Sequence, residues 1–177
     1  MDELHLLLQH LRQPEYVHVL LNPLPVYATV MGVLALTMGL LMRSRQAQVV
    51  ALTVVIVGCA SAYPVARYGQ RGYDRVYAMS NSEAQQWLDV HRQRAERFVY
   101  AFYITGLVAL AALAAIWKAP KAATPLGIAA LILAAASVGI GGWISHAGGQ
   151  VRHSEFREGP PLSPVEHEEE HEHSHTH

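Results

Sequence analysis

The sequence contains little charge and almost no cysteine. Charged residues make up 15% of the 177-residue chain and apolar residues 51%, a composition that indicates a membrane protein rather than a soluble domain. The formal net charge of −1 gives no general affinity for nucleic acid, so we expect no nucleic-acid partner. The single cysteine, Cys59, excludes an intramolecular disulfide and any multi-cysteine zinc or iron–sulfur site. Histidine is therefore the main candidate ligand.

Four long runs contain no charged residue at all: 24–42, 49–66, 98–117 and 126–145. Each is close to the about 20 residues that a helix needs to cross about 30 Å of hydrocarbon. The sequence therefore predicts an all-α fold, a four-helix transmembrane bundle in a lipid bilayer. Apart from Cys59 and tyrosines near the ends, these runs lack ionisable side chains, which argues against a pump or a coupled transporter.

The connections between the predicted spans differ in length. RSRQAQ (43–48) and KAPKAATP (118–125) are short, so each joins two spans on the same side of the membrane, which we call side B. The N-terminus, residues 67–97 and everything after His146 then lie on the opposite side, side A. Nearly all of the extramembrane chain is therefore expected on side A.

Basic residues give two conflicting indications of orientation. Arg43 and Arg45 directly follow the first span, and Lys118 and Lys121 lie on the same side B, which makes side B cytoplasmic by the positive-inside rule. The other nine basic residues of the chain lie on side A and favour the reverse. Because the first span usually dominates, we predict a multi-pass protein of the inner (plasma) membrane with both termini on the periplasmic or outer face.

Composition divides the chain into three parts. Residues 1–23 form an amphipathic segment that either lies on the membrane surface or caps the bundle, with an apolar face of Leu4, Leu7, Leu8 and Leu11. Residues 24–157 form the four-helix transmembrane domain, with residues 67–97 as its extramembrane cap. Residues 158–177 form a tail rich in histidine and glutamate, which we expect to be disordered.

Within the cap, the sequence predicts a turn followed by a helix. Gly69 and Gly72 favour a turn after the second span. SNSEAQ (80–85) resembles a capping box and predicts a helix that begins near Ser82. No breaker follows before Phe98, so this helix is expected to extend into the third span.

Four histidines lie near the side-A ends of the spans: His18, His91, His146 and His153. Imidazoles from different helices at one end of a bundle can bind haem iron axially, or bind zinc, copper or nickel. The alternative is that they form hydrogen bonds at the membrane interface without binding a ligand. His146 and His153 are separated by Gly148-Gly149, which is expected to break the fourth helix. No span has a histidine in its middle, which argues against electron transfer across the membrane.

Aromatic and basic residues surround the same end of the bundle. The aromatic residues form either the wall of a cofactor site or an interfacial belt; they are Tyr63, Tyr68, Tyr100, Tyr103 and Trp143. The arginines are candidates to bind an anionic ligand, a quinol or lipid phosphates; they are Arg67, Arg71, Arg75, Arg94, Arg97 and Arg152. The alternative is that they only contact lipid headgroups and the interleaved acids Asp74, Asp89, Glu96 and Glu155.

Small residues are frequent in the fourth span. They recur at i, i+4 in the pairs Ala130/Ala134, Ala135/Gly139 and Ser137/Gly141. Such residues let helices approach closely, either within this bundle or at an interface with a membrane partner or a second copy. Cys59 is expected to be a small core residue.

Four segments resemble those of small uncharacterised bacterial four-helix integral membrane proteins. They are NPLPVYATVMGVLAL (22–36), YPVARYGQRGYDRV (63–76), WLDVHRQRAERF (87–98) and GGWISHAGGQVRHSEFR (141–157). In style they are also weakly similar to cytochrome b561-type bundles. The resemblance implies haem b as a candidate cofactor, with His91, His146 and His153 as candidate ligands.

The chain ends in EHEEEHEHSHTH (166–177). Imidazoles and carboxylates alternate there and form a candidate weak site for zinc, copper or nickel through His167, His171, His173, His175 and His177. The alternative is a solvated acidic terminus.

No catalytic motif is visible in the sequence. A Ser/His/Asp arrangement, a phosphate-binding loop and paired catalytic carboxylates are all missing, which favours a protein that is not an enzyme. The sequence therefore predicts a membrane protein that binds a metal ion or haem at the side-A end, in metal or redox homeostasis. The alternative is a structural or interaction subunit of a larger membrane complex.

Overall fold

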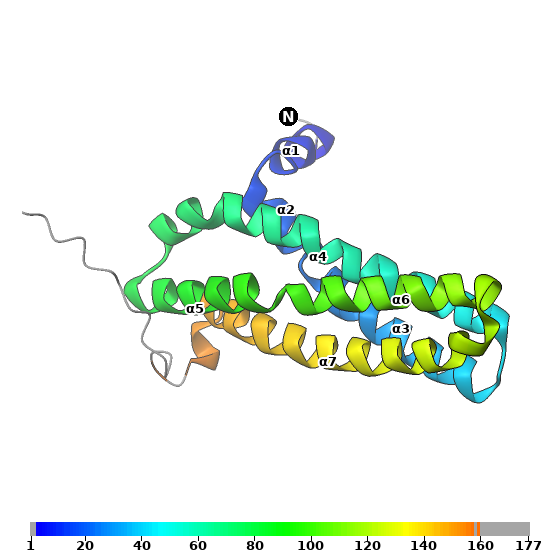
Figure 1. The fold of residues 1–177 in the computed structure, drawn as a ribbon. Coiled ribbons are helices and arrows are strands. Elements are labelled where there is room, and N and C mark those ends of the chain that lie inside the picture. The colour runs from blue at the N-terminus through cyan, green and yellow to red at the C-terminus, as the bar shows by residue number, and fades with distance from the viewer. Residues whose placement is uncertain (1–2, 158, 160–177) are drawn as a thin grey trace, which may run out of the picture.

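The computed structural model describes residues 3–157 and residue 159. Every regular element in this part of the chain is a helix (Figure 1). In order, the elements are α1 (Glu3–His10), α2 (Pro14–Leu21), α3 (Pro23–Leu41), α4 (Arg45–Met79), α5 (Ser82–Phe98), α6 (Tyr100–Lys118), α7 (Pro120–Arg152) and the short 3₁₀ helix η1 (Ser154–Phe156). The predicted all-α four-helix bundle is confirmed.

Four helical stretches are long and apolar enough to cross a membrane: Pro14–Leu41, Arg45–Met79, Ser82–Lys118 and Pro120–Arg152. They contain the four predicted charge-free runs, except for Met42 at the end of the first. At about 1.5 Å per residue, the 35 residues of α4 span about 52 Å, well beyond about 30 Å of hydrocarbon. The chain is therefore a multi-pass membrane protein whose helices continue past the bilayer on side A.

The spans pack in antiparallel pairs, α3 against α4 and α6 against α7. Their shared core is made of small and branched side chains such as Leu36, Leu52, Val55, Ala109 and Ala134. Cys59 is 1% exposed and belongs to this core, as predicted.

Close approach between the helices depends on the small residues of α7. Ser137 is buried and forms a 2.9 Å hydrogen bond with Thr105 of α6. Gly141 contacts Phe102 so closely that a Cβ would lie 2.9 Å from its ring. Ala130 and Ala134 are buried, whereas Ala135 and Gly139 are exposed. Two of the three predicted pairs therefore pack inside the bundle.

A glycine in α3 provides a test of this packing. A Cβ on Gly32 would lie 2.5 Å from the side chain and 3.1 Å from the backbone of Val55, whereas a Cβ on Gly139 would meet nothing within 4 Å. Gly32→Val is therefore expected to destabilise the protein by about 1–3 kcal/mol, the usual cost of overpacking, and Gly139→Val by much less. Thermal unfolding in detergent measures both, and equal melting temperatures would contradict this packing.

Two predicted interruptions are wrong. α4 continues through Gly69 and Gly72, and α7 continues through Gly148-Gly149 to Arg152. The physical reason is tertiary. Gly72 lies against the backbone of Glu15, since a Cβ there would be 2.9 Å from the Glu15 N and Cα atoms. Gly69, Gly72 and Gly148 permit close contacts with residues of other helices, and the local tendency of these glycines to break a helix is overridden.

The predicted start of the cap helix is confirmed. α5 begins at Ser82, and the side chain of Asn81 accepts a hydrogen bond from the Ala84 N–H at 2.8 Å. Val99 alone separates α5 from α6 and keeps helical backbone angles, so the cap helix leads directly into the third span.

α1 stands apart from the bundle in Figure 1 and contains no buried residue. Its leucines, including Leu4 and Leu8, are exposed. Of the two predicted roles of the 1–23 segment, capping of the bundle is therefore not supported for α1, whereas α2 in the same segment packs against α4. The division into three parts, the orientation in the membrane and the type of membrane stay predictions.

Candidate cofactor site

His18 lies on α2, where this short helix packs against α4 at the side-A end. Its Nδ1 is 2.9 Å from the backbone oxygen of Val65. A carbonyl oxygen only accepts, so Nδ1 carries the hydrogen and donates it, and Nε2 of the neutral ring holds the lone pair. Gly69, one turn after Val65, makes room for the ring, because a Cβ there would lie 2.9 Å from its Cε1 and Nδ1 atoms.

His91 lies on α5 and contacts α7 in the same way as His18 contacts α4. Its Nδ1 donates to the backbone oxygen of Ile144 at 2.9 Å, which again leaves the lone pair on Nε2. Gly148, one turn after Ile144, lies against the ring, and a Cβ there would be 3.0 Å from Nδ1. Each histidine is thus oriented by a carbonyl and accommodated by a glycine four residues later.

The two imidazoles are neighbours. Their ring centroids are 6.1 Å apart and their planes are inclined at 70°. Both side chains are partly exposed and line one cavity of about 1100 Å³. The structure therefore joins His18 and His91 from separate helices at a single site.

The wall of this cavity contains only part of the predicted aromatic set. Tyr63, Tyr100 and Tyr103 line it, whereas Tyr68 and Trp143 do not. Trp143 instead packs edge-on against the ring of Phe98, with 5.4 Å between the centroids.

Four arginines line the cavity: Arg67, Arg75, Arg92 and Arg152. Arg75 pairs with Glu15 at 2.8 Å, and Arg92 pairs with Glu96 at 2.9 Å. Neither Arg67 nor Arg152 takes part in a side-chain ion pair among residues 3–157 and 159. The cavity therefore carries more positive than negative charge.

The other predicted arginines lie elsewhere. Arg71, Arg94 and Arg97 do not line the cavity. The Arg94 guanidinium lies 4.1 Å above the ring of Trp143 and donates to that residue's backbone oxygen at 3.0 Å.

His153 lies on the cavity wall but is not paired with His18 or His91. It is exposed and forms a 2.9 Å contact with the carboxylate of Glu155. A hydrogen bond from the backbone N–H of Glu155, followed by the bond from His153, lowers the pKa of the Glu155 carboxyl below its usual value. His153 is therefore a rim residue with a carboxylate partner of its own.

His146 does not line the cavity of His18 and His91. Its ring meets the edge of Trp87 at a centroid distance of 6.4 Å, and it lines a separate cavity of about 500 Å³ with Gln150 and Arg157. In the described part of the chain, no three histidine, cysteine, aspartate or glutamate side chains are grouped to hold a metal ion. The four predicted histidines thus form one pair, one rim residue and one residue that lines a separate cavity.

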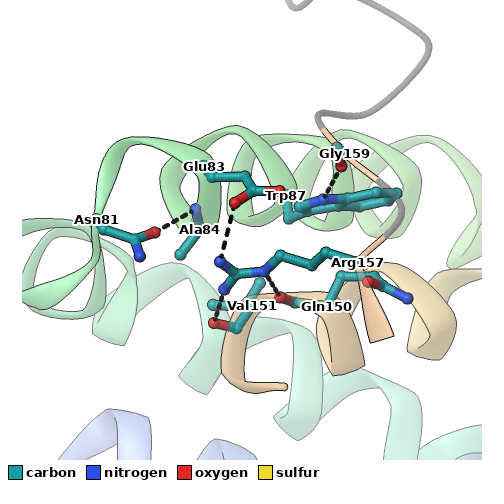
Figure 2. A network of polar contacts seen from close by, with 8 residues as sticks. All are labelled: Asn81, Glu83, Ala84, Trp87, Gln150, Val151, Arg157 and Gly159. Atoms are coloured by element: carbon teal, nitrogen blue, oxygen red, sulfur yellow. Dashed lines mark hydrogen bonds and ion pairs between the residues drawn. The ribbon is translucent and has the colours of Figure 1, made fainter. Parts of the chain in front are cut away.

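The residues after α7 are attached to the start of α5, as Figure 2 shows. Arg157, whose side chain is 6% exposed, donates to the backbone oxygens of Gln150 at 2.6 Å and Val151 at 2.9 Å. Its guanidinium also lies 3.5 Å from the carboxylate of Glu83. These contacts fix the end of α7, the helix that supplies Ile144 and Gly148.

In comparisons with known proteins, no family model, curated protein or solved structure matches this chain. The resemblance to cytochrome b561-type bundles stays a prediction. The predicted tail site, including His167 and His177, lies outside the described residues.

Several residues of the site were not predicted. Gly69 and Gly148 were interpreted as breakers, and Arg92 was not singled out. A signal for the glycines does exist, because each follows, by four residues, the residue of its helix whose carbonyl accepts the histidine hydrogen bond: Gly69 follows Val65 on α4, and Gly148 follows Ile144 on α7. This repeated spacing beside two interfacial histidines distinguishes them from ordinary turn residues.

Proposed function

We propose that this integral membrane protein binds a metal ion or a metal-containing cofactor through His18 and His91 at the side-A face, in metal or redox homeostasis. One observation carries the proposal. Two imidazoles from different helices line the same cavity, and each has its Nδ1 hydrogen-bonded to a backbone carbonyl. Both Nε2 atoms are thereby left with the lone pair that a metal requires.

The hydrogen bonds support this role for a physical reason. A histidine that binds a metal commonly donates its other ring N–H to a carbonyl, which fixes the tautomer and the orientation of the ring. His18 and His91 both have this arrangement, whereas His153 uses its Nδ1 on an exposed carboxylate. Two histidines with only a structural role would not need the same Nδ1 hydrogen bond to a carbonyl on two separate helices.

Elemental analysis of the full-length protein, purified in detergent without a metal-affinity step, tests the proposal. A second form carries serine in place of the five tail histidines, His167, His171, His173, His175 and His177. We expect about one metal atom per chain in both forms. His18→Ala and His91→Ala, each made in the tail-substituted form, are expected to lose about nine-tenths of the metal or more. Loss of a ligand should weaken binding at least as much as loss of a partner that orients a ligand, which costs about 10–100-fold.

His146→Ala is the matched control, since this residue lies in the separate cavity, and it is expected to keep the metal. Metal that disappears with the tail histidines would assign binding to the terminus and reject the cavity. A protein without metal in every form would also reject the proposal and favour an interaction subunit of a membrane complex.

A further inference from the structure

The spacing of the two rings discriminates between kinds of metal site. With a metal–nitrogen distance of about 2.0 Å and about 1.1 Å from nitrogen to ring centre, two imidazoles on opposite sides of one metal have centroids about 6.3 Å apart. Two imidazoles on a tetrahedral ion are closer, at about 5.1 Å. The observed 6.1 Å is closer to the spacing of the opposed arrangement than to that of the tetrahedral one. The 70° between the planes is compatible with it, since both rings can turn about the common axis.

The number of ligands leads to the same conclusion. A tetrahedral zinc or copper site needs three or four protein ligands, but residues 3–157 and 159 contain no group of three histidine, cysteine or acidic side chains suited to a metal. An iron porphyrin brings four nitrogens of its own and needs only two axial ligands from the protein. His18 and His91 are sufficient for that.

The cavity is also far larger than an ion requires. Its volume of about 1100 Å³ is slightly above the about 300–1,000 Å³ typical of pockets for organic ligands. Tyr63 and Tyr103 contribute aromatic surface to the wall, which suits a flat apolar macrocycle. A bare ion would leave most of this space to water.

The excess of arginine indicates an anionic group on the ligand. Arg75 and Arg92 are paired with Glu15 and Glu96, whereas Arg67 and Arg152 have no ion-pair partner among the described residues. Arg67 is on α4 and Arg152 is at the end of α7, the two helices whose carbonyls orient the histidines. Guanidinium groups suit carboxylates, and a porphyrin of the haem type carries two.

We infer that the cavity binds an iron porphyrin, with His18 and His91 as its axial ligands and with Arg67 and Arg152 beside its carboxylates. This inference rests on the proposed function and specifies the class of cofactor. Binding takes two neutral imidazoles through Nε2, while the Nδ1 hydrogens stay on the carbonyls of Val65 and Ile144. Gly69 and Gly148 allow α4 and α7 to hold the rings in this position.

Optical spectroscopy of the full-length protein in detergent tests the inference. Hemin is added in increments to protein made without added haem, and spectra are recorded before and after reduction with dithionite. We expect saturation at one hemin per chain and the spectrum of six-coordinate, low-spin iron with two imidazole ligands. His18→Gly and His91→Gly are each expected to give a five-coordinate or weakly bound form.

Free imidazole at millimolar concentration is expected to restore the low-spin spectrum of both glycine variants, because it can replace the missing ring. Such rescue separates loss of a ligand from loss of the fold. His153→Gly is the matched control from the same cavity wall, and its spectrum is expected to be that of the unchanged protein.

The arginines are tested by affinity. Arg67→Gln and Arg152→Gln are each expected to weaken hemin binding about tenfold, the loss typical of one charge-assisted contact. Arg43→Gln, which removes the same charge on side B, is expected to leave the affinity unchanged. Equal affinities in all three variants would overturn the assignment of the carboxylates.

The results that would reject the porphyrin differ from those that would reject the metal site itself. Stoichiometric zinc, copper or nickel that depends on His18 and His91, without a hemin spectrum that depends on them, would overturn the porphyrin while keeping the metal site. Hemin that binds equally well to both histidine variants would also overturn it. If neither metal nor hemin depends on the two histidines, both the inference and the proposed function fail.

Discussion

Replacing Gly72 with leucine is expected to weaken metal or cofactor binding about 10–100-fold, the loss typical when the support of a metal ligand is removed, although Gly72 contributes no ligand. A Cβ at this position would lie 2.9 Å from the backbone N and Cα of Glu15, so α2 and α4 could no longer approach each other. His18 is on α2, three residues after Glu15, and its acceptor Val65 is on α4. Separating the two helices therefore moves one ligand away from the other.

The measurement is metal content or hemin titration of the purified variant. Gly142→Leu is the control, because a Cβ on Gly142 would meet nothing within 4 Å. It adds the same side chain to a membrane helix and is expected to bind normally. Retained binding in the Gly72 variant would show that the position of α2 against α4 is not needed for the site.

Replacing Arg157 with alanine is expected to lower the free energy of unfolding by roughly 3 kcal/mol. The change removes two charge-assisted hydrogen bonds to backbone oxygens and an ion pair, and each such bond typically contributes about 1.5–3 kcal/mol, with partial compensation by water. Because these contacts join the end of α7 to Glu83 of α5, the variant is also expected to be cleaved more readily by proteases after Arg152.

Thermal unfolding and limited proteolysis in detergent check this expectation. Arg71→Ala is the control, since Arg71 is exposed and forms no side-chain hydrogen bond among the described residues. Its melting temperature is expected to be within about 1 °C of that of the unchanged protein, in line with ordinary surface substitutions. Similar losses in both variants would indicate that the Arg157 contacts contribute little.

The spans were predictable because a simple physical requirement defines them. Hydrocarbon excludes charge, so the four charge-free runs between residues 24 and 145 predict four helices by length and composition alone. The start of α5 was equally accessible, since Asn81 uses a side-chain cap that depends only on neighbours in the sequence. Both predictions rest on local information.

The site was only half predictable, because it depends on how helices turn and approach one another. The sequence placed four histidines at one end of the bundle, but rotation of α5 decides that His91 meets His18 while Trp87 meets His146. The prediction that glycines interrupt α4 and α7 was wrong for a related reason. Gly69 and Gly148 look like breakers in isolation, and their value appears only when an imidazole from another helix lies against them.

The position of the cavity at one end of the bundle has an electrical consequence. His18 and His91 both precede the charge-free run of their span, and the acceptors Val65 and Ile144 are the next-to-last residues of theirs. A full crossing of the bilayer by one charge involves about 2.3 kcal/mol per 100 mV, but a ligand or an electron that enters from side A crosses little of that field. Occupancy and reduction of the site are therefore expected to follow the chemistry of one compartment and to be nearly independent of whether the membrane is energised.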